Sequence, residues 1–483
     1  MSKFNPSQTD RTTNRSGHAA YKMPEKQKLV TQVLTSFFNE KKFYGDNSAE
    51  MQETIKKVIA QDPKFVAKLA VFARREFHMR SVAHVLTAHL AHEVAGKPYT
   101  RDVVKAVSLR GDDVTEIMAC YLDLFGKPIP NALKKGISDA MQGFDEYTLA
   151  KYKGDGKAVK MRDLLCLCRP TPKNDAQSDL WKRLLNNELQ TPITWETQLS
   201  ANGNNTETWE SLIESGKVGY MALLRNLRNI IKANPSNIEK VFSYIQNPEA
   251  VKRSKQLPFR FLAAYKEVAE IGGSRVLDVL ENAIDASIVN LPKLPGTTVI
   301  AVDTSGSMGR AISEKSSIRC YEIAMLLGMI ANRICENAHF YTFDTTIKKG
   351  MYSSRSGILS VTSGACCGGG TNMFLPFQEM LFKKIKADRV IILSDNECNS
   401  GGTYYHNGAY GRATVQQIAD KYRKDTGNDI WVHAIDLQGY GTQQFHGSKT
   451  NIIAGWSEKV LDFILLAEQG EGTLEKTIEQ YTY

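Results

Sequence analysis

The chain has 483 residues, of which 42% are hydrophobic and 23% are charged, and its formal net charge is +9. This balance and this length exclude a disordered chain and a single small domain, so we expect two domains or one large non-globular assembly. There is no apolar run of about 18 residues, no apolar signal core near the start and no regular framework among the cysteines; these absences predict a cytoplasmic protein with reduced thiols and no membrane span.

Residues 1–23 form a polar segment, and residues 24–290 read as one helix after another. Segments such as "PEKQKLVTQVLTSFFN", "AEMQETIKKVIAQ" and "GYMALLRNLRNIIKAN" space apolar residues three and four apart, with short Gly, Pro, Asp or Asn breaks between segments. Many helices without intervening strands predict a HEAT-like repeat, that is, an α-solenoid of paired helices. No clean sequence repeat is present, so this prediction depends on periodicity alone.

The positive charge belongs to this helical part. Residues 1–295 carry about +10, and residues 296–483 carry about −1. Such an asymmetry indicates an anionic partner for the first part of the chain. Simple solubility explains the same charge equally well, so charge alone does not decide between the two.

The pattern changes at "NLPKLPGTT", residues 290–298, where two prolines and a glycine end the helical periodicity. Strand-like runs then alternate with helix-like runs over residues 291–483. The strands are "TVIAVD", "AHFYTFDT", "RVIILSD" and "IWVHAIDL", with a weaker one at "TNIIAG". This alternation predicts an α/β domain with a doubly wound parallel sheet, in which the carboxyl ends of the strands share one edge.

Oxygen-bearing side chains follow the ends of two of these strands. "TVIAVD" leads into Asp303, Ser305 and Ser307, and "RVIILSD" ends in Asp395. Thr371 lies in the glycine-flanked stretch "GGGTNMF", before the next helix. Hydroxyl and carboxylate oxygens at the ligand-binding edge of an α/β sheet suit a hard divalent cation. A single Asp-x-Ser-x-Ser stretch is more often an ordinary Ser/Gly turn.

"DTSGSM", "GGGTN" and "LSDNE", in this order, resemble the metal-ion-dependent adhesion site (MIDAS) of von Willebrand factor A domains. The resemblance implies that Ser305, Ser307 and Thr371 are direct or near-direct ligands of Mg²⁺. It also implies that Asp303 and Asp395 act partly through water. In such a site an acidic group of a partner completes the metal shell.

Cationic residues cluster at several places in the helical part. Lys151 to Arg169 include a basic stretch around a glycine-containing turn, and Arg225 and Arg228 are three apart, so they share a helix face. Cations of this kind neutralise RNA phosphates, and arginine planes stack on unpaired bases. Each residue taken alone is more simply a solvated helix face or the partner of a carboxylate. The candidate RNA-binding residues are Lys151, Lys160, Arg162, Arg169, Arg225, Arg228, Lys252, Arg253, Lys255 and Arg260.

"VGYMALLRNLRNI", "KMRDLLCLCRPTPK", "SKQLPFRFLAAYKEV" and "TPITWETQLS" resemble the TROVE module of the Ro60 autoantigen family. The resemblance implies a ring of helical repeats closed by the A domain. It also implies binding of Y-like noncoding RNA on the outer surface and of the single-stranded 3′ ends of misfolded RNA in the central hole. The family often has a His where this chain has Arg169, which keeps a hydrogen-bond donor and adds charge.

No catalytic set is visible, so we expect a monomeric protein that is not an enzyme and that acts in noncoding RNA quality control or ribonucleoprotein assembly. The metal site is expected to recruit an acidic protein ligand, such as a nuclease. An alternative is a metal-dependent protein–protein adhesion scaffold, in which the basic helices are incidental. A metal-dependent hydrolase is a third reading, which an adhesion-type site disfavours because its open position is used for a ligand.

Overall fold

The computed structural model describes residues 11–36, 49–190, 192–312, 316–399, 402–406, 409–470 and 473–483. It divides into two compact units. One, which we call the helical unit, contains residues 25–197 and 475–483, and the other, which we call the mixed unit, contains residues 1–24 and 198–474. The division falls within α11 (Trp195–Asn202), so the helices that follow α11 belong to the same unit as the sheet.

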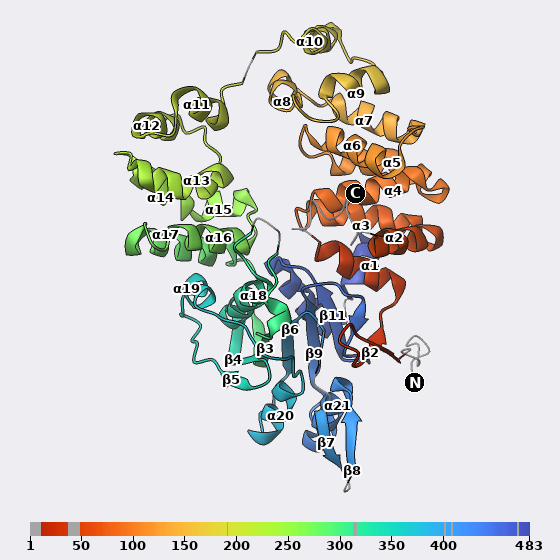
Figure 1. The fold of residues 1–483 in the computed structure, drawn as a ribbon, viewed down its shortest axis with the longest axis vertical. Coiled ribbons are helices and arrows are strands. Elements are labelled where there is room, and N and C mark those ends of the chain that lie inside the picture. The colour runs from red at the N-terminus through yellow and green to blue at the C-terminus, as the bar shows by residue number, and fades with distance from the viewer. Residues whose placement is uncertain are drawn as a thin grey trace. The chain divides into compact units, whose positions relative to one another are not determined.

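The helical unit is a stack in which each helix packs on helices close to it in the chain, such as α3 on α4, α4 on α6 and α5 on α7 (Figure 1). Asp62 caps α3 by accepting a hydrogen bond from the Phe65 amide, and Pro63 occupies the first helical position, where a missing N–H costs nothing. Helix α4 is buried on every side from Val82 to Ala91 and forms the centre of the stack. The helices are α1 (Glu25–Leu34), α2 (Ala49–Gln61), α3 (Pro63–Arg75), α4 (Ser81–His92), α5 (Lys97–Val107), α6 (Asp113–Phe125), α7 (Asn131–Met141), α8 (Glu146–Lys151), α9 (Met161–Cys168) and α10 (Asp175–Leu185).

The end of the chain is part of the helical unit. Helix α23 (Leu474–Gln480) leads into a tail that packs on α1 and α3. Lys26 Nζ contacts Glu479 Oε1 at 2.7 Å, and Tyr481 donates a hydrogen bond of 3.0 Å to Glu76 Oε1. The Tyr481 ring also meets the ring of Phe72 edge-on. The first and last helices of the chain are therefore joined by side-chain contacts within one unit.

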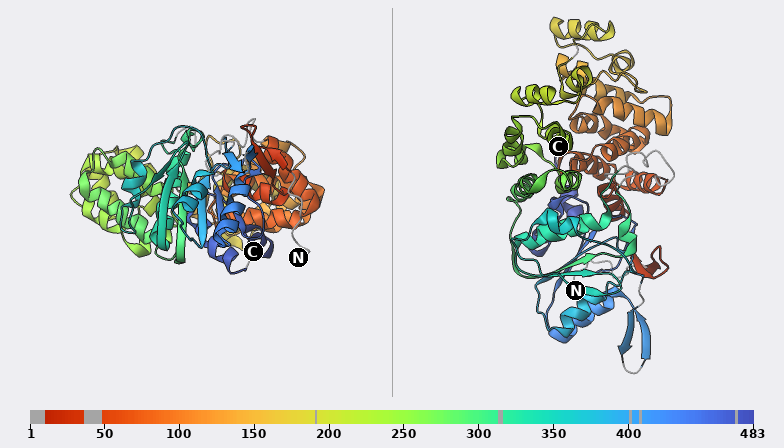
Figure 2. Two further views of the ribbon diagram at one scale, coloured as in Figure 1. Left: turned by 90° about the horizontal axis from the view of Figure 1, so that it is seen from below. Right: turned by 60° about the vertical axis from the view of Figure 1, so that its left-hand side comes forward.

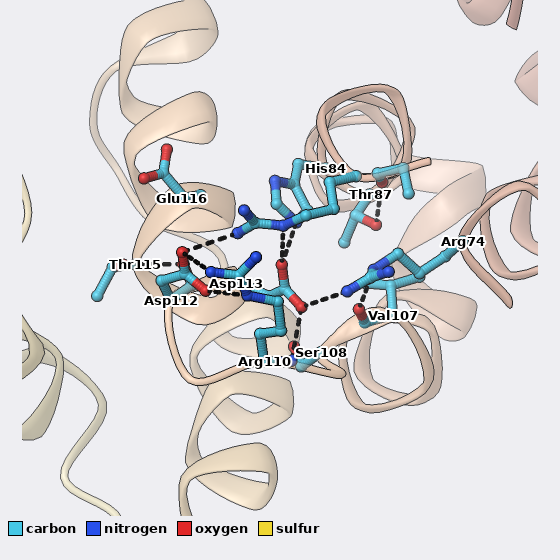
Figure 3. A network of polar contacts seen from close by, with 12 residues as sticks. Arg74, His84, Thr87, Val107, Ser108, Arg110, Asp112, Asp113, Thr115 and Glu116 are labelled. Carbon is cyan, nitrogen blue, oxygen red and sulfur yellow. Dashed lines mark hydrogen bonds and ion pairs between the residues drawn. The ribbon is translucent and has the colours of Figure 1, made fainter. Parts of the chain in front are cut away.

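A buried ionic network joins α3, α4 and α6 (Figure 3). Asp113 is fully buried and contacts Arg74 at 2.9 Å, Arg80 at 2.8 Å and His84 at 3.1 Å. Burial alone would raise the pKa of Asp113, but the His84 hydrogen bond and the charges of Arg74 and Arg80 outweigh it and hold that pKa well below its usual range. Because each cation contacts the carboxylate directly, Asp113 is neutralised by the protein itself.

Six helices precede the α/β part in the mixed unit, and two of them, α16 and α17, pack on it. Lys266 Nζ contacts Glu322 Oε1 at 2.7 Å, and Arg333 contacts Asp285 at 3.0 Å, which ties α16 and α17 to α18. The Glu281 carboxylate accepts hydrogen bonds from the backbone of α19. The six helices are α12 (Thr206–Glu214), α13 (Tyr220–Ala233), α14 (Ile238–Ile245), α15 (Pro248–Ser254), α16 (Pro258–Val268) and α17 (Gly273–Ser287).

A six-stranded sheet is the centre of the α/β part, with the strand order β11-β9-β6-β3-β4-β5. The strands are parallel, except that β5 runs antiparallel to β4. This confirms the predicted doubly wound sheet, in which the weak run "TNIIAG" becomes β11. The strands are β3 (Leu294–Asp303), β4 (Cys335–Phe343), β5 (Ile347–Lys349), β6 (Arg389–Ser394), β9 (Trp431–Asp436) and β11 (Thr450–Ala454).

Helices cover both faces of this sheet (Figure 2). One face packs against α20 (Leu375–Phe382) and α21 (Val415–Thr426), with Phe377, Met380 and Tyr422 among the buried contacts. The other face receives α18 (Cys320–Ile334). There, a Cβ at Gly328 would lie 2.7 Å from Val302, so only glycine allows this close approach. The remaining helices of this part are α19 (Ile358–Ser363) and α22 (Asp462–Glu468).

Two small β structures were not expected from the sequence. β1 (Arg11–Thr13) pairs with β2 (Ala19–Lys22), which pairs in turn with β10 (Thr442–Gln443). The polar segment expected at residues 1–23 is therefore, over its described part, a component of the mixed unit. An antiparallel ribbon, β7 (Gly402–His406) and β8 (Ala409–Ala413), projects from the α/β part between β6 and α21 (Figure 1).

Candidate functional site

Three loops meet at the carboxyl edge of the sheet and bring the five predicted metal residues together. β3 ends at Asp303, and its neighbour β6 is followed directly by Asp395. The third loop, which carries Thr371, is joined to the first by two backbone hydrogen bonds of 2.9 Å, from Gly306 N to Gly369 O and from Gly368 N to Thr304 O. The parallel neighbouring strands place the loops after β3 and β6 side by side, and these hydrogen bonds hold the Thr371 loop against the first of them.

The polar atoms of these loops hold one another in place. Asp303 accepts hydrogen bonds from Ser305 N at 2.9 Å and from Ser394 Oγ at 2.5 Å. The hydroxyls of Ser305 and Ser307 are 3.2 Å apart. The Thr371 amide donates to Asn399 Oδ1 at 2.8 Å, which fixes the third loop against the loop that follows Asp395. The oxygens therefore have a fixed arrangement.

Two buried carboxylates at this site have no cationic partner among the described residues. Asp303 and Asp395 are both fully buried, and Asp395 Oδ2 accepts no hydrogen bond from any described group. Burial raises the pKa of both side chains, and the charge of Asp395 raises that of Asp303 further. A divalent cation would remove this electrostatic cost, so the orphaned oxygen and the paired acids fit a metal ion.

The available donors fit Mg²⁺ better than a soft metal. In the described ranges, no group of three or more His, Cys, Asp or Glu side chains is arranged to hold a metal, so a metal at this edge depends on hydroxyls as well as carboxylates. Ser305, Ser307 and Thr371 provide hydroxyl oxygens, and few protein oxygens with retained water are what Mg²⁺ prefers. Ser307 is exposed, whereas Ser305 and Thr371 are buried, so the site opens to solvent beside Ser307.

Two further buried acids lie beside the site and were not predicted. Asp436 ends β9, next to β6, and burial raises its pKa to about 6. Glu397 accepts a hydrogen bond of 3.3 Å from Ser16 N, and burial and the charge of Asp395 raise its pKa to about 7. The run "IWVHAID" carries the same strand-then-Asp signal as "RVIILSD", so the sequence could have indicated Asp436. Glu397 has no such signal.

Four of the ten candidate RNA-binding residues belong to the helical unit. Lys151 ends α8 and lies near the rings of Tyr147 and Tyr152, and Lys160 precedes α9. Arg162 is exposed on α9, and Arg169 follows that helix in the left-handed conformation with φ of 46°. None of the four forms an ion pair with a described carboxylate. Lys151 and Lys160 flank the glycine-containing turn, as the sequence indicated, whereas Arg162 and Arg169 lie on and directly after α9.

The other six candidates belong to the mixed unit. Arg225 and Arg228 are both exposed on α13, as their spacing predicted, but Arg228 is paired with Glu267 at 3.0 Å. The remaining four lie close together in the chain from α15 to α16 and include three exposed cations. They are Lys252, Arg253, Lys255 and the half-buried Arg260, whose guanidinium lies over the Phe259 ring.

Family comparisons agree with this architecture. The TROVE domain family matches residues 24–190 and 186–276, and the Ro60 vWA domain family matches residues 297–409. The chain belongs to the TROVE and Ro60 family. Its helical elements thus correspond to the TROVE domain and its sheet to the Ro60-type A domain.

Two curated relatives and one solved structure are similar to this TROVE protein. Telomerase protein component 1 is 24% identical over 322 residues in Rattus norvegicus and 23% identical over 331 residues in Mus musculus. These alignments cover 49% and 50% of this chain but only 12% of each relative. The crystal structure of the Ro (RSR) protein of Deinococcus radiodurans matches 93% of this chain and 100% of that chain, with a TM-score of 0.63 and 16% identity.

The structural match confirms the predicted fold class of helical repeats followed by a von Willebrand factor A domain. The closure of the helices into a ring involves both units and stays a prediction. The boundary expected between residues 290 and 291 also stays a prediction, because the two compact units divide within α11 and not between α17 and β3.

Proposed function

We propose that this TROVE protein binds RNA through its helical elements and acts in noncoding RNA quality control or ribonucleoprotein assembly. Family membership supports RNA binding. The observation that carries the proposal is a set of exposed cations that form no ion pair with a described carboxylate. They are Arg162, Arg169, Arg225, Lys252 and Lys255.

These cations differ from several exposed arginines on other helices. Arg101 is paired with Asp139, Arg183 with Glu146 and Arg275 with Glu239, so their charge is already satisfied. An unpaired guanidinium or ammonium group on a helix surface is free to displace counterions from a phosphate chain. Tyr147, which is 50% exposed beside Lys151, offers a ring on which an unpaired base can stack.

The finer proposal names the RNA. A small structured, Y-like RNA would use the phosphate-binding cations, and the single-stranded 3′ end of a misfolded RNA would combine them with stacking on Tyr147. The protein would act as a cytoplasmic monomer, by binding and not by catalysis. No helix in the described ranges is both long and apolar enough to cross a membrane.

A gel-shift titration tests RNA binding. The ligand is a stem–loop RNA with a single-stranded 3′ tail, titrated at low and at moderate salt. Replacing Arg162, Arg169, Arg225 and Lys252 with Gln should weaken binding and lower the salt slope by roughly 0.7 for each phosphate that is no longer neutralised. The matched control is Arg275→Gln, an exposed arginine that is already paired. Equal affinity for the quadruple variant and the control would contradict the proposal.

For the A domain, we propose a Mg²⁺ site held by Ser305, Ser307, Thr371, Asp303 and Asp395. These protein oxygens would hold the ion, and the ion would supply a positive charge for an anionic ligand. An acidic group of a protein partner, such as a nuclease, would complete the shell. Calorimetry tests the site, since Asp303→Ala and Thr371→Ala should each weaken Mg²⁺ binding, whereas unchanged binding in both would contradict it.

The second candidate function is a metal-dependent adhesion scaffold without RNA, and the orphaned Asp395 oxygen at the metal site favours it. The two functions differ in one observable. A scaffold would bind its protein ligand only with Mg²⁺ and would show no RNA shift even at low salt.

A further inference from the structure

The N-terminal segment lies against one of the three loops of the metal site. Its strands β1 and β2 are joined by a turn that contains Asn14, Arg15 and Ser16. Asn14 is buried and donates a hydrogen bond of 2.8 Å to Cys398 O, and Ser16 N donates to Glu397 Oε2 at 3.3 Å. Arg15 is therefore held beside the loop that follows Asp395.

Two arginines, Arg15 and Arg310, lie near Tyr440. The Arg15 guanidinium carbon is 4.0 Å from the centre of the Tyr440 ring, so it covers one face of that ring. Burial and the charge of Asp395 raise the pKa of Tyr440, whereas the nearby Arg310 and Arg15 act in the opposite direction. Arg310 itself ends the loop "DTSGSMGR". Arg15 thus lies beside the loop that follows Asp395, and Arg310 belongs to the first loop.

The third arginine, Arg319, lies beside the first loop, close to the loop that carries Thr371. Its Nη1 donates a hydrogen bond of 2.6 Å to Gly309 O, and its backbone bridges to Ala311. Gly309 lies against Cys367 of the Thr371 loop, since a Cβ at Gly309 would be 3.0 Å from Cys367 Sγ. Burial raises the pKa of the Cys367 thiol, and the nearby charge of Arg319 opposes that rise. The three arginines therefore lie beside the loops of the metal site. We call Arg15, Arg310 and Arg319 the arginine rim.

The arginine rim is exposed and electrostatically unsatisfied. All three side chains are exposed, and none forms an ion pair with a carboxylate in the described part of the chain. Other arginines of the α/β part do form such pairs, with Arg333 on Asp285 and Arg389 on Glu468. Three positive charges around one oxygen-lined site therefore favour a ligand with several negative charges.

We propose that the arginine rim selects an acidic protein segment with several carboxylates, of which one completes the metal shell while others bind the rim. This rests on the proposed Mg²⁺ site and names the partner that it takes. A guanidinium group binds a carboxylate through two parallel hydrogen bonds, so three arginines at fixed positions select for the spacing of the acids as well as for their charge. A nucleic acid is disfavoured as the occupant, because Arg15 already covers the face of Tyr440 on which a base would stack.

Fluorescence anisotropy tests this proposal on the full chain. The probe is a fluorescein-labelled peptide of alternating Asp and Gly residues, titrated with Mg²⁺ or with EDTA. We expect Mg²⁺-dependent binding that weakens about fivefold for each of Arg15→Gln, Arg310→Gln and Arg319→Gln, and that falls with added salt. Arg15→Lys should recover part of the loss. The matched control is Arg355→Gln, an exposed arginine beside the carboxyl end of α18, whereas Arg319 precedes its amino end.

Three results would overturn the proposal in different ways. If the peptide binds in a Mg²⁺-dependent manner and the rim variants have the same affinity as Arg355→Gln, the arginine rim has no role in binding, whereas the metal site is unaffected. No peptide binding by a protein that binds Mg²⁺ in calorimetry would remove the acidic partner. Rim-dependent binding of a single-stranded RNA, but not of the peptide, would replace the protein partner with nucleic acid. Far-ultraviolet circular dichroism and Mg²⁺ calorimetry on each variant separate these results from misfolding.

Discussion

Asp113 of the helical unit and the two acids of the candidate metal site differ in how their charge is balanced. In the helical unit, Asp113 is buried and surrounded by Arg74, Arg80 and His84, so the protein supplies its own positive charge. In the mixed unit, Asp303 and Asp395 are equally buried, and no described cation pairs with either. The pKa of Asp113 is accordingly lowered, and those of Asp303 and Asp395 are raised. The difference separates an acid whose charge the protein balances from acids whose charge a bound cation would balance.

The largest expected loss of stability follows from breaking the buried ionic network around Asp113 in the helical unit. Asp113→Asn leaves Arg74 and Arg80 buried without their carboxylate, which should lower the free energy of unfolding by about 3–5 kcal/mol. Urea unfolding followed by circular dichroism measures the change. The control is Asp139→Asn, which removes the partner of the exposed Arg101 and should change stability little. An equal change in the free energy of unfolding for the two variants would show that Asp113 stabilises the fold no more than an exposed ion pair does.

The mixed unit should respond to Mg²⁺ where the helical unit does not. A protein saturated at 100 times the Kd gains about 2.7 kcal/mol from a ligand that binds only the folded state. Thermal unfolding with and without Mg²⁺ measures this gain, which Asp303→Asn should abolish. Asp388→Asn is the control, because Asp388 lies at the opposite edge of the sheet and accepts a hydrogen bond from Thr297 N. Retention of the full Mg²⁺ shift in Asp303→Asn would contradict the metal assignment.

A smaller effect is expected in the pH dependence of the free energy of unfolding, to which His89 of the helical unit and the acids of the mixed unit contribute with opposite sign. Burial lowers the pKa of His89 to about 3, so the folded protein holds this ring neutral while the unfolded chain protonates it below its ordinary pKa of 6.5. The contribution of His89 to the free energy of unfolding is therefore complete above pH 6.5. It is lost on acidification below that value, by up to about 1.4 kcal/mol per pH unit. The raised pKa values of Asp303 and Asp395 act in the opposite direction, because acid stabilises their protonated folded forms.

His89→Leu tests this pH dependence. Urea unfolding from about pH 7 to about pH 5 should show a shallower loss of stability in the variant than in the natural chain. His18→Gln, a substitution in the N-terminal segment of the mixed unit, is the control. Parallel pH profiles for the natural chain and His89→Leu would show that His89 does not carry the acid sensitivity.

The sequence predicted that Asp303 and Asp395 lie at one edge of the sheet because the signal for each is local. A run of buried residues followed by Asp303 or Asp395 marks the end of a parallel strand, and such ends meet at one edge. Asp113 has no comparable signal, because an acid in the first turn of a helix is ordinarily a solvent-exposed partner of the helix dipole. Its burial arises from Arg74 and Arg80, which are more than 30 residues away.

Long-range pairing explains the other missed features. Each strand of the small sheet that contains β2 and β10 is four residues or shorter, so none shows a readable alternation. The division of the units within α11 was also unexpected, although "NNELQTPITWETQLSANGNN" around it is polar and rich in Asn and Thr. The arginine rim could not be predicted, because Arg15 and Arg310 approach one another only through Tyr440, which follows a distant strand.

The pairing of β2 with β10 has a consequence for folding. The segment that contains Arg15 is synthesised before its contact at Cys398, which is separated from Asn14 by 384 residues. Until Cys398 and β10 have been made, the ribbon of β1 and β2 lacks its partners, and contacts between such distant residues form slowly. The loop that follows Asp395 therefore gains the support of this ribbon late in folding.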